Sequence, residues 1–248
     1  MSEVLDVAKK DGRWTECPSC SEIIITQKLQ NNLWVCPHCE YHFRLGAKQR
    51  IEIVCDKDSF SEISLGETGA EDRWQVPDEA IFGGTAAVNT LRCIIGVMDF
   101  SHKGGTMGVQ VGQYVIHLMK KASQEGLPLV FFCASGGVRI QEGIWGLFQM
   151  LRTTQVRNET QHVPMITVFT DPTTGGVSAS FAALADVLLA EPGSRIGFAG
   201  PRVIESTLQC TLPSDFQNAE KLLANGFLDR IVHRHELRDT LSLILRWF

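Results

Sequence analysis

Two hydrophobic periods alternate along the middle of this 248-residue chain. Residues 129–133 and 166–169 are short and almost continuously apolar, as is typical of strands buried on both faces of a sheet. Between them, apolar residues recur at the three- and four-residue spacing of one helix face: Ile144, Leu147, Phe148 and Leu151. The pattern therefore predicts strands alternating with helices, which is an α/β arrangement.

The same reading, extended along the chain, gives a list of expected elements. Strands are expected over residues 85–89, 91–100, 129–133, 166–169, 187–190 and 195–199. Helices are expected over residues 47–55, 112–125, 178–184 and 237–248, and one more begins after Gly200-Pro201. The Asp171-Pro172 pair predicts a turn, and the polar residues 57–80 predict a connector or loop.

Four cysteines near the N-terminus have the spacing C-x2-C-x15-C-x2-C: Cys17, Cys20, Cys36 and Cys39. This spacing is typical of a zinc ribbon, in which two knuckles each give two thiolates to one tetrahedral Zn²⁺. Four thiolates leave no coordination position for water, so we expect a structural metal. A redox pair or chance spacing is the alternative. Residues 23–26 and 33–35 predict the two strands of a hairpin, with His38 and His42 at the surface.

Composition limits the class of protein. With 44% hydrophobic and 21% charged residues, the chain can form one sizeable core and a small appended module. Its apolar runs are shorter than the roughly 18 residues of a membrane span, and residues 1–14 resemble neither a signal nor a transit peptide. We therefore expect a protein that stays in its compartment of synthesis. The net charge of −5 disfavours general binding to nucleic acid.

Three glycine pairs each follow a predicted strand and precede a helix: Gly104-Gly105, Gly136-Gly137 and Gly175-Gly176. They recur after 32 and 39 residues, which suggests repeated ββα units around one core. Glycine permits close backbone approaches, and the first turn of a helix has N–H groups that suit an anion. Tight packing alone is the alternative explanation for each pair.

Other catalytic patterns are missing from the sequence. It contains no G-x-G-x-x-G, no P-loop and no G-x-S-x-G, so Ser135 and Ser178 are expected to make turn and cap hydrogen bonds. The remaining cysteines are expected to be buried structural thiols: Cys55, Cys93, Cys133 and Cys210.

Together, several long motifs resemble one family, the β subunit of the bacterial or plastid acetyl-CoA carboxylase carboxyltransferase. Besides the cysteine spacing they are ASGGVRIQEG (134–143), TDPTTGGVSASF (170–181), AEPGSRIGFAGPRVIE (190–205) and LPSDFQNAE (212–220). The resemblance covers residues 14–232. Val138 and Ile140 depart from the usual family pattern, and the connector around residues 66–88 is shorter, so a paralogue serving another pathway is an alternative.

This resemblance implies a crotonase-like fold of ββα units preceded by the zinc ribbon. The implied domains are a ribbon over residues 1–45, a helix and connector over 46–85, and a carboxyltransferase domain over 86–248. It also implies an α2β2 enzyme that moves a carboxyl group from carboxybiotin, held on a biotin carboxyl carrier protein, to acetyl-CoA, giving malonyl-CoA. Biotin carboxylase would belong to the larger complex, in the bacterial cytoplasm or the plastid stroma.

By the same resemblance, the backbone N–H groups of Gly175 and Gly176 would stabilise the thioester oxyanion, and Gly136 and Gly137 would line the same cleft. CoA contacts are expected from Lys103, Gly104, Gly105, Arg139, Thr174 and Arg202. For Arg139 and Arg202, interior salt bridges that hold the glycine loops are the alternative, which we favour.

Two other functions stay open. One is an acyl-CoA hydrolase or decarboxylase, which would need a protein acid or base that the sequence does not reveal. The other is a zinc-ribbon protein that binds nucleic acid or has a regulatory role, supported by a local group of basic residues: Lys9, Lys10, Arg13, Arg44, Lys48 and Arg50.

Overall fold

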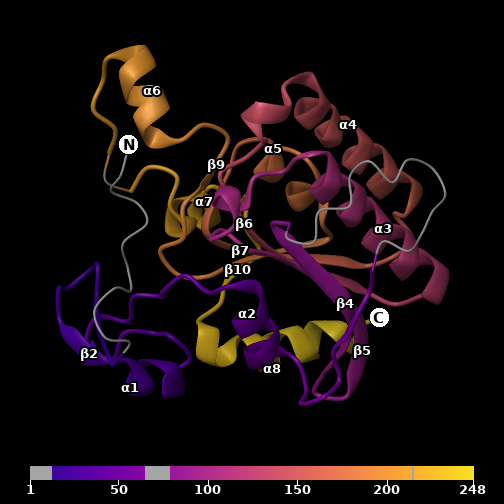
Figure 1. The fold of residues 1–248 in the computed structure, drawn as a ribbon, viewed down its shortest axis with the longest axis horizontal. Helices are drawn as coiled ribbons and strands as arrows, with labels where there is room; N and C mark the ends of the chain where they lie inside the picture. The colour runs from indigo at the N-terminus through magenta and orange to yellow at the C-terminus, as the bar shows by residue number, and fades with distance from the viewer. Residues whose placement is uncertain (1–12, 65–78, 214) are drawn as a thin grey trace. The chain divides into compact units, whose positions relative to one another are not determined.

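The structure is a computed structural model that describes residues 13–64, 79–213 and 215–248. The chain divides into two compact units, Met1–Leu45 and Gly46–Phe248 (Figure 1). The predicted segment 46–85 is not a unit of its own, because its described parts belong to the second unit. No helix in the described ranges is both long enough and apolar enough to cross a bilayer.

The first unit contains a small hairpin. Strands β1 (Trp14–Glu16) and β2 (Ile23–Ile25) pair antiparallel, and α1 (Thr26–Asn31) follows directly. The predicted strand at residues 33–35 is wrong. Leu33 and Trp34 have positive φ, which strands do not adopt, and Val35 makes only an isolated bridge to His42.

The second unit contains a mixed sheet. Among the described residues, eight strands form it in the order β10-β8-β7-β6-β5-β4-β3, with β9 paired to β7. Neighbours from β5 to β10 are parallel, and β3, β4 and β5 are antiparallel. The strands are β3 (Ser61–Glu62), β4 (Ile81–Val88), β5 (Leu91–Met98), β6 (Leu129–Ser135), β7 (Met165–Thr174), β8 (Val187–Ala190), β9 (Ile196–Gly197) and β10 (Arg230–Ile231).

Helices cover both faces of this sheet, which explains the continuous apolar runs of its strands. In β6, Phe131 packs into the core cluster of α3 (Val109–Glu125), while Phe132 packs into the cluster of α2 (Ala47–Val54) and α8 (Arg234–Leu245). Figure 1 shows α3 and α4 (Ile144–Glu159) on one side, with α2 and α8 on the other. The predicted helices at 47–55, 112–125 and 237–248 are thus confirmed within a few residues.

The segment after β7 differs from the prediction. Instead of turning at Asp171-Pro172, which has a cis peptide bond, β7 continues to Thr174. The predicted helix at 178–184 is replaced by a short helix α5 (Gly175–Ser178) and a 3₁₀ helix η4 (Phe181–Leu184). The predicted strand at 195–199 shrinks to β9. In the predicted connector, Ser61–Glu62 forms edge strand β3, and residues 65–78 lie outside the described ranges.

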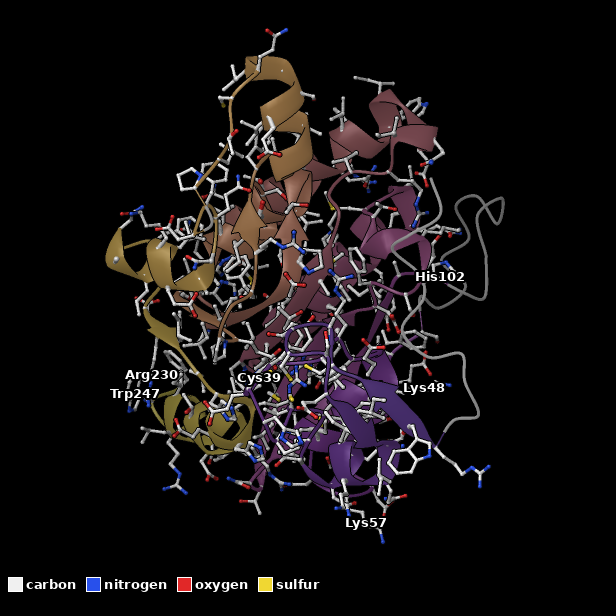
Figure 2. The ribbon with its side chains drawn as sticks, turned by 90° about the vertical axis from the view of Figure 1, so that its left-hand side faces the viewer. Cys39, Lys48, Lys57, His102, Arg230 and Trp247 are labelled. Atoms are coloured by element: carbon white, nitrogen blue, oxygen red, sulfur yellow. The ribbon has the colours of Figure 1, made fainter. Side chains whose placement is uncertain are left out.

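Short helices complete the domain. Pro201 stands at the start of α6 (Pro201–Leu208), as expected from its fixed φ and missing N–H. α7 is Ala219–Ala224, and two more 3₁₀ helices are η2 (Lys103–Gly105) and η3 (Ile140–Glu142). In Figures 1 and 2, α6 projects from the second unit at the same end as α4.

Candidate active site and metal centre

The four cysteines of the ribbon converge on one point. Their Sγ atoms all lie within 4.8 Å of one another, and Figure 2 shows the yellow sulfur atoms gathered beside Cys39. The Sγ atoms of Cys17 and Cys39 are 3.6 Å apart, and those of Cys20 and Cys36 are 3.8 Å apart. A tetrahedral zinc with Zn–S bonds of about 2.3 Å requires sulfurs about 3.8 Å apart. The donor set therefore fits a structural Zn²⁺.

Neither nearby histidine joins this group among the described residues. His38 is exposed, as predicted, but His42 is buried, so the prediction of a surface position is wrong for His42. The backbone of His42 forms an isolated antiparallel bridge with that of Val35.

The three glycine pairs meet at one edge of the sheet. Each lies at or just beyond the carboxyl end of a strand, and β5, β6 and β7 are parallel neighbours. The first pair touches the second, since Gly136 N–H donates to Gly104 O at 2.8 Å. A Cβ on Gly105 would lie 2.0 Å from Ala134 O, so only glycine fits there. Such an edge is where ligands bind in parallel α/β sheets.

The second pair touches the third through backbone alone. Gly137 and Gly175 both have positive φ, and a Cβ on Gly175 would lie 2.8 Å from Gly137 Cα. Gly176 is covered from another side, because a Cβ there would lie 2.3 Å from Val138 Cγ2 and 2.7 Å from Met150 Sδ. The turn at Gly175-Gly176 is thus held between the preceding glycine turn and helix α4.

The second and third glycine pairs differ in the hydrogen bonds of their backbone N–H groups. The N–H groups of Gly136 and Gly137 are already used, donating to Gly104 O at 2.8 Å and to Ser135 Oγ at 3.0 Å. Gly175 and Gly176 open α5, where N–H groups have no partner inside the helix. Thr174 precedes them without capping them, since its Oγ1 donates to Ser135 O at 3.3 Å. No side chain therefore caps the start of α5.

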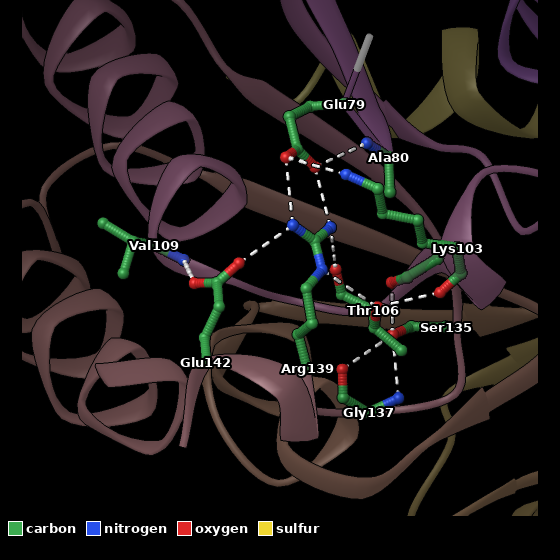
Figure 3. A network of polar contacts seen from close by, with 10 residues as sticks. Glu79, Ala80, Lys103, Thr106, Val109, Ser135, Gly137, Arg139 and Glu142 are labelled. Carbon is green, nitrogen blue, oxygen red and sulfur yellow. Dashed lines mark hydrogen bonds and ion pairs between the residues drawn. The ribbon is translucent and has the colours of Figure 1, made fainter. Parts of the chain in front are cut away.

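Arg139 lies in a buried ionic network that Figure 3 shows from close by. Its Nη1 donates to Glu79 and Glu142, each at 3.0 Å, and its Nη2 donates to Glu79 at 2.7 Å. Thr106 accepts the remaining bonds, through its carbonyl at 3.0 Å and its hydroxyl at 3.3 Å. All five guanidinium donors are thereby engaged, which supports the interior salt bridge over a contact with CoA.

The network links the ends of several elements. Glu142 Oε2 accepts from Val109 N–H at 2.6 Å, so it joins η3 to the first turn of α3. Although burial raises the pKa of Glu79, the hydrogen bond and charge of Arg139 outweigh it and hold that pKa below its usual value. The hydrogen bond to Glu79 likewise raises the pKa of Arg139, despite its burial. Both groups are therefore charged at neutral pH.

The other basic residues expected at CoA are less constrained or lie outside the description. Lys103 Nζ lies 3.8 Å from Glu79 Oε1, and its side chain is half exposed. The Arg202 side chain lies outside what the structure describes. Arg50, one of the residues in the predicted basic surface group, is instead buried in an ion pair with Glu191, which also binds Arg234. The prediction that Arg50 contributes to a basic surface is therefore wrong.

The serine hydroxyls and the cysteine thiol described near the glycine turns are engaged or buried. Ser135 Oγ donates to Gly105 O at 2.6 Å, and Ser178 Oγ donates to Gly197 O at 2.7 Å, which confirms their predicted structural role. Burial raises the pKa of the Cys133 thiol. Cys55 and Cys93 are also buried as predicted, whereas Cys210 is exposed and that prediction is wrong.

Two known protein families match the parts of the chain that contain these features. Residues 43–246 match the family described as carboxyl transferase domain, and residues 14–39 match the acetyl-CoA carboxylase zinc finger domain. These matches define the class, a carboxyltransferase domain of crotonase-like fold that carries a zinc ribbon.

Curated relatives specify the family further. A protein of Carboxydothermus hydrogenoformans, named acetyl-coenzyme A carboxylase carboxyl transferase subunit beta, is 44% identical over 96% of this chain and 90% of its own length. A Natranaerobius thermophilus protein, named acetyl-coenzyme A carboxylase carboxyl transferase subunits beta/alpha, is 42% identical over 95% of this chain, which spans 42% of it. The chain belongs to the family of acetyl-CoA carboxylase carboxyl transferase β subunits.

Solved structures share the fold. A transcarboxylase 12S structure, with methylmalonyl-coenzyme A and methylmalonic acid bound, has a TM-score of 0.70 and 25% identity over 80% of this chain and 41% of its own. A Pseudomonas malonate decarboxylase heterodimer has a TM-score of 0.66 and 23% identity, over 82% of this chain and 86% of its own. The crotonase-like fold predicted from the motifs is thus confirmed.

Proposed function

We propose that this chain is the β component of a biotin-dependent carboxyltransferase that transfers a carboxyl group from carboxybiotin to acetyl-CoA. The observation that carries this proposal is the row of glycine turns at the carboxyl ends of β5, β6 and β7, in a member of this family. The product would be malonyl-CoA, for fatty acid or related biosynthesis. The relatives reported above are bacterial, which favours a cytoplasmic site of action over a plastid one.

The chemistry requires stabilisation of negative charge more than a side-chain base. The methyl carbon of acetyl-CoA loses a proton and bonds to the carboxyl carbon, while the C–N bond of carboxybiotin breaks and its nitrogen takes the proton. Charge then accumulates on the thioester oxygen. Two aimed N–H groups would stabilise it, and removing one such donor typically costs about 2.7 to 4 kcal/mol of barrier.

Gly175 and Gly176 are the proposed donors, because their N–H groups begin α5 without a side-chain cap. Gly136 and Gly137 have a different role in this proposal. Since their own N–H groups are used inside the chain, they shape the wall against which the third turn packs. Gly104 and Gly105 extend that wall, and Thr174 fixes the third turn to the second through Ser135.

A residue that binds a phosphate of CoA needs a positive charge that other residues of the chain do not already neutralise. Lys103 meets this requirement better than Arg139, since its side chain is 49% exposed and its ion pair to Glu79 is long, at 3.8 Å. We propose Lys103 as a phosphate contact and Arg139 as a residue that holds the second glycine turn in place.

The proposed activity needs other proteins. An α subunit would supply the stabilisation of the biotin ureido oxygen, and a biotin carboxyl carrier protein would deliver the carboxyl group after biotin carboxylase has loaded it. The fused beta/alpha relative supports a physical association of the two carboxyltransferase subunits. Zinc in the ribbon would stabilise that unit without entering the reaction, because four thiolates close its coordination shell.

The decisive experiment mixes this chain with its cognate α subunit and measures malonyl-CoA formation from carboxybiotin and acetyl-CoA. In Gly175→Ala the third turn must shift, since the added Cβ would lie 2.8 Å from Gly137 Cα. We expect kcat to fall by about 100-fold or more. Gly193→Ala is the matched control, because Gly193 has the same φ of +67° with nothing within 4 Å, and it should keep its activity.

Two results would contradict the proposal. Full activity of Gly175→Ala would exclude the third turn as the oxyanion site. Release of free CoA from acetyl-CoA at equal rates with and without carboxybiotin would instead identify a hydrolase.

A further inference from the structure

Helix α4 has an apolar face whose side chains are exposed among the described residues. Ile144, Leu147, Phe148 and Leu151 follow the helical spacing, and Trp145 and Ile140 of η3 extend the surface. The six side chains, which we name the α4 face, are between 47% and 87% exposed. Their spacing predicts a buried stripe, so the helix turns outward the side that would ordinarily form the core.

The inward side of α4 shows that this orientation is built in. In its first three turns the buried residues are small or polar, namely Gly146, Gln149 and Thr153, and apolar Val156 is buried only near its end. Gln149 fits against Gly112 of α3, where a Cβ would lie 2.5 Å from its Oε1. Thr153 Oγ1 donates to Gln149 O at 2.8 Å. A contiguous exposed patch of large apolar residues on a fixed helix marks an interaction site.

The composition of the face selects its partner. Residues 143–151 carry no charged side chain, and nearby Glu142 is held by Arg139 and Val109. An anionic ligand such as CoA or a nucleic acid would find no cation along this stretch. The face fits another apolar protein surface, as the centre of a protein–protein interface requires.

The known relatives indicate which protein binds the α4 face. One relative fuses beta and alpha subunits in a single chain, and the malonate decarboxylase neighbour of the same fold is a heterodimer. The face also lies beside the glycine turns. Met150 of the same helix packs against Gly176, and Ile140 directly follows Arg139. A partner docked here would lie next to the third turn.

We propose that the α4 face is the docking surface for the α subunit, and that docking sets the wall of the active site through α4 and Met150. This proposal rests on the proposed function, because that function supplies the need for an α subunit. It adds the place on this chain where the α subunit binds. It also adds that binding affects Gly176 through α4, whose Met150 packs against that glycine.

The test measures the affinity of the full-length chain for its cognate α subunit by titration calorimetry. Leu147→Asp places a charge at the centre of the face and should raise Kd at least about tenfold. Leu243→Asp is the matched control, since Leu243 on α8 is 53% exposed and Leu147 is 54% exposed. The control should bind like the original chain. Thermal unfolding and zinc content of both variants establish that they fold equally.

Hydrogen exchange gives an independent measurement that needs no variant. Adding the α subunit to the original chain should slow amide exchange in residues 144–151 more than in α8. If Leu147→Asp fails to fold, Phe148→Gln replaces it in the titration, with the same expected loss of affinity.

Several outcomes would overturn the proposal. Equal affinity of Leu147→Asp and the original chain would do so, as would equal weakening by Leu243→Asp. A chain that self-associates through this face, with Leu147→Asp dissociating it and α binding unchanged, would assign the face to a second copy. If instead the complex forms and depends on Leu147 but makes no malonyl-CoA, the docking surface stands and the proposed function fails.

Discussion

Gly137 and Gly175 contact each other backbone to backbone at the ends of neighbouring strands β6 and β7. A Cβ on Gly137 would lie 3.1 Å from Gly175 Cα, and a Cβ on Gly175 would lie 2.8 Å from Gly137 Cα. A side chain at either position must push the two turns apart. The two positions are therefore energetically coupled, because a second side chain enters space that the first has already opened.

This coupling predicts a non-additive loss of stability. Gly137→Ala and Gly175→Ala should each lower the free energy of unfolding by about 1 to 3 kcal/mol, since each overpacks a close backbone contact. The double variant should lose less than the sum of the two, by at least about 0.5 kcal/mol. Urea unfolding of the isolated chain measures all three values.

A distant glycine provides the control for that cycle. Gly193→Ala combined with Gly137→Ala should be additive within about 0.5 kcal/mol, because apart from its chain neighbours no residue comes within 4 Å of the Cβ position of Gly193. Additivity in the Gly137 and Gly175 pair would show that the two turns do not constrain each other.

The ion pair between Arg139 and Glu79 leads to a second prediction, a larger loss of stability when Arg139 is replaced. Arg139→Met keeps an apolar side chain but leaves the carboxylate of Glu79 without its main partner, and that side chain is only 13% exposed. Breaking a buried pair in this way typically costs about 3 to 5 kcal/mol. Arg139→Lys should lose less, because it keeps the charge and loses the bidentate geometry. A Met variant as stable as the original chain would contradict this network.

The same ion pair predicts a pH dependence. Because Arg139 lowers the pKa of Glu79 in the folded state, the pair stabilises the fold above the ordinary glutamate value of about 4.3. That contribution is lost as the pH falls through the lowered pKa. Between pH 7 and pH 4 the original chain should therefore lose more stability than Arg139→Met. Parallel losses in urea titrations at both pH values would contradict the shift.

The central strands and their glycine turns were predictable because their signals are local. Continuous apolar runs mark buried parallel strands, and parallel neighbours bring their carboxyl ends to one edge. The partner of Arg139 was not predictable, because Glu79 lies 60 residues earlier and belongs to no periodic pattern. The sequence could indicate only that an interior salt bridge was possible.

One feature that the pattern does not determine and one wrong prediction have different physical causes. The period of Ile144, Leu147 and the following apolar residues predicts one helix face but not the direction in which it points, and here it points away from the core. At Leu33 and Trp34 an apolar run predicts a strand, but the turn toward the second cysteine pair imposes positive φ. Tertiary geometry overrides strand propensity at that point.

Zinc content provides a direct test of the ribbon. The purified chain should contain about one zinc, because four thiolates converge on a single point. Removing zinc with a chelator should unfold the first unit, whose core is small and includes only a few buried residues such as Ile24, Leu29 and Phe43. Loss of exchange protection at these residues measures the effect.

Single cysteine variants separate the ligands from the other thiols. Cys36→Ser should lose the zinc, whereas Cys210→Ser should keep about one zinc per chain, since Cys210 lies outside the cluster. Retention of full zinc occupancy by Cys36→Ser would contradict the four-thiolate site.

Thiol reactivity should distinguish the four cysteines outside the ribbon. Burial raises the pKa of Cys93 from 9.0 to about 12, so its thiolate fraction at pH 8 falls by about a thousandfold. Cys55 and Cys133 are also buried, while Cys210 is exposed. With zinc bound, an alkylating reagent should label Cys210 first, and peptide mass spectrometry over time identifies the site. Labelling of Cys133 as fast as Cys210 would mean that the thiol is accessible beside the glycine turns, which would reopen the hydrolase alternative for this chain.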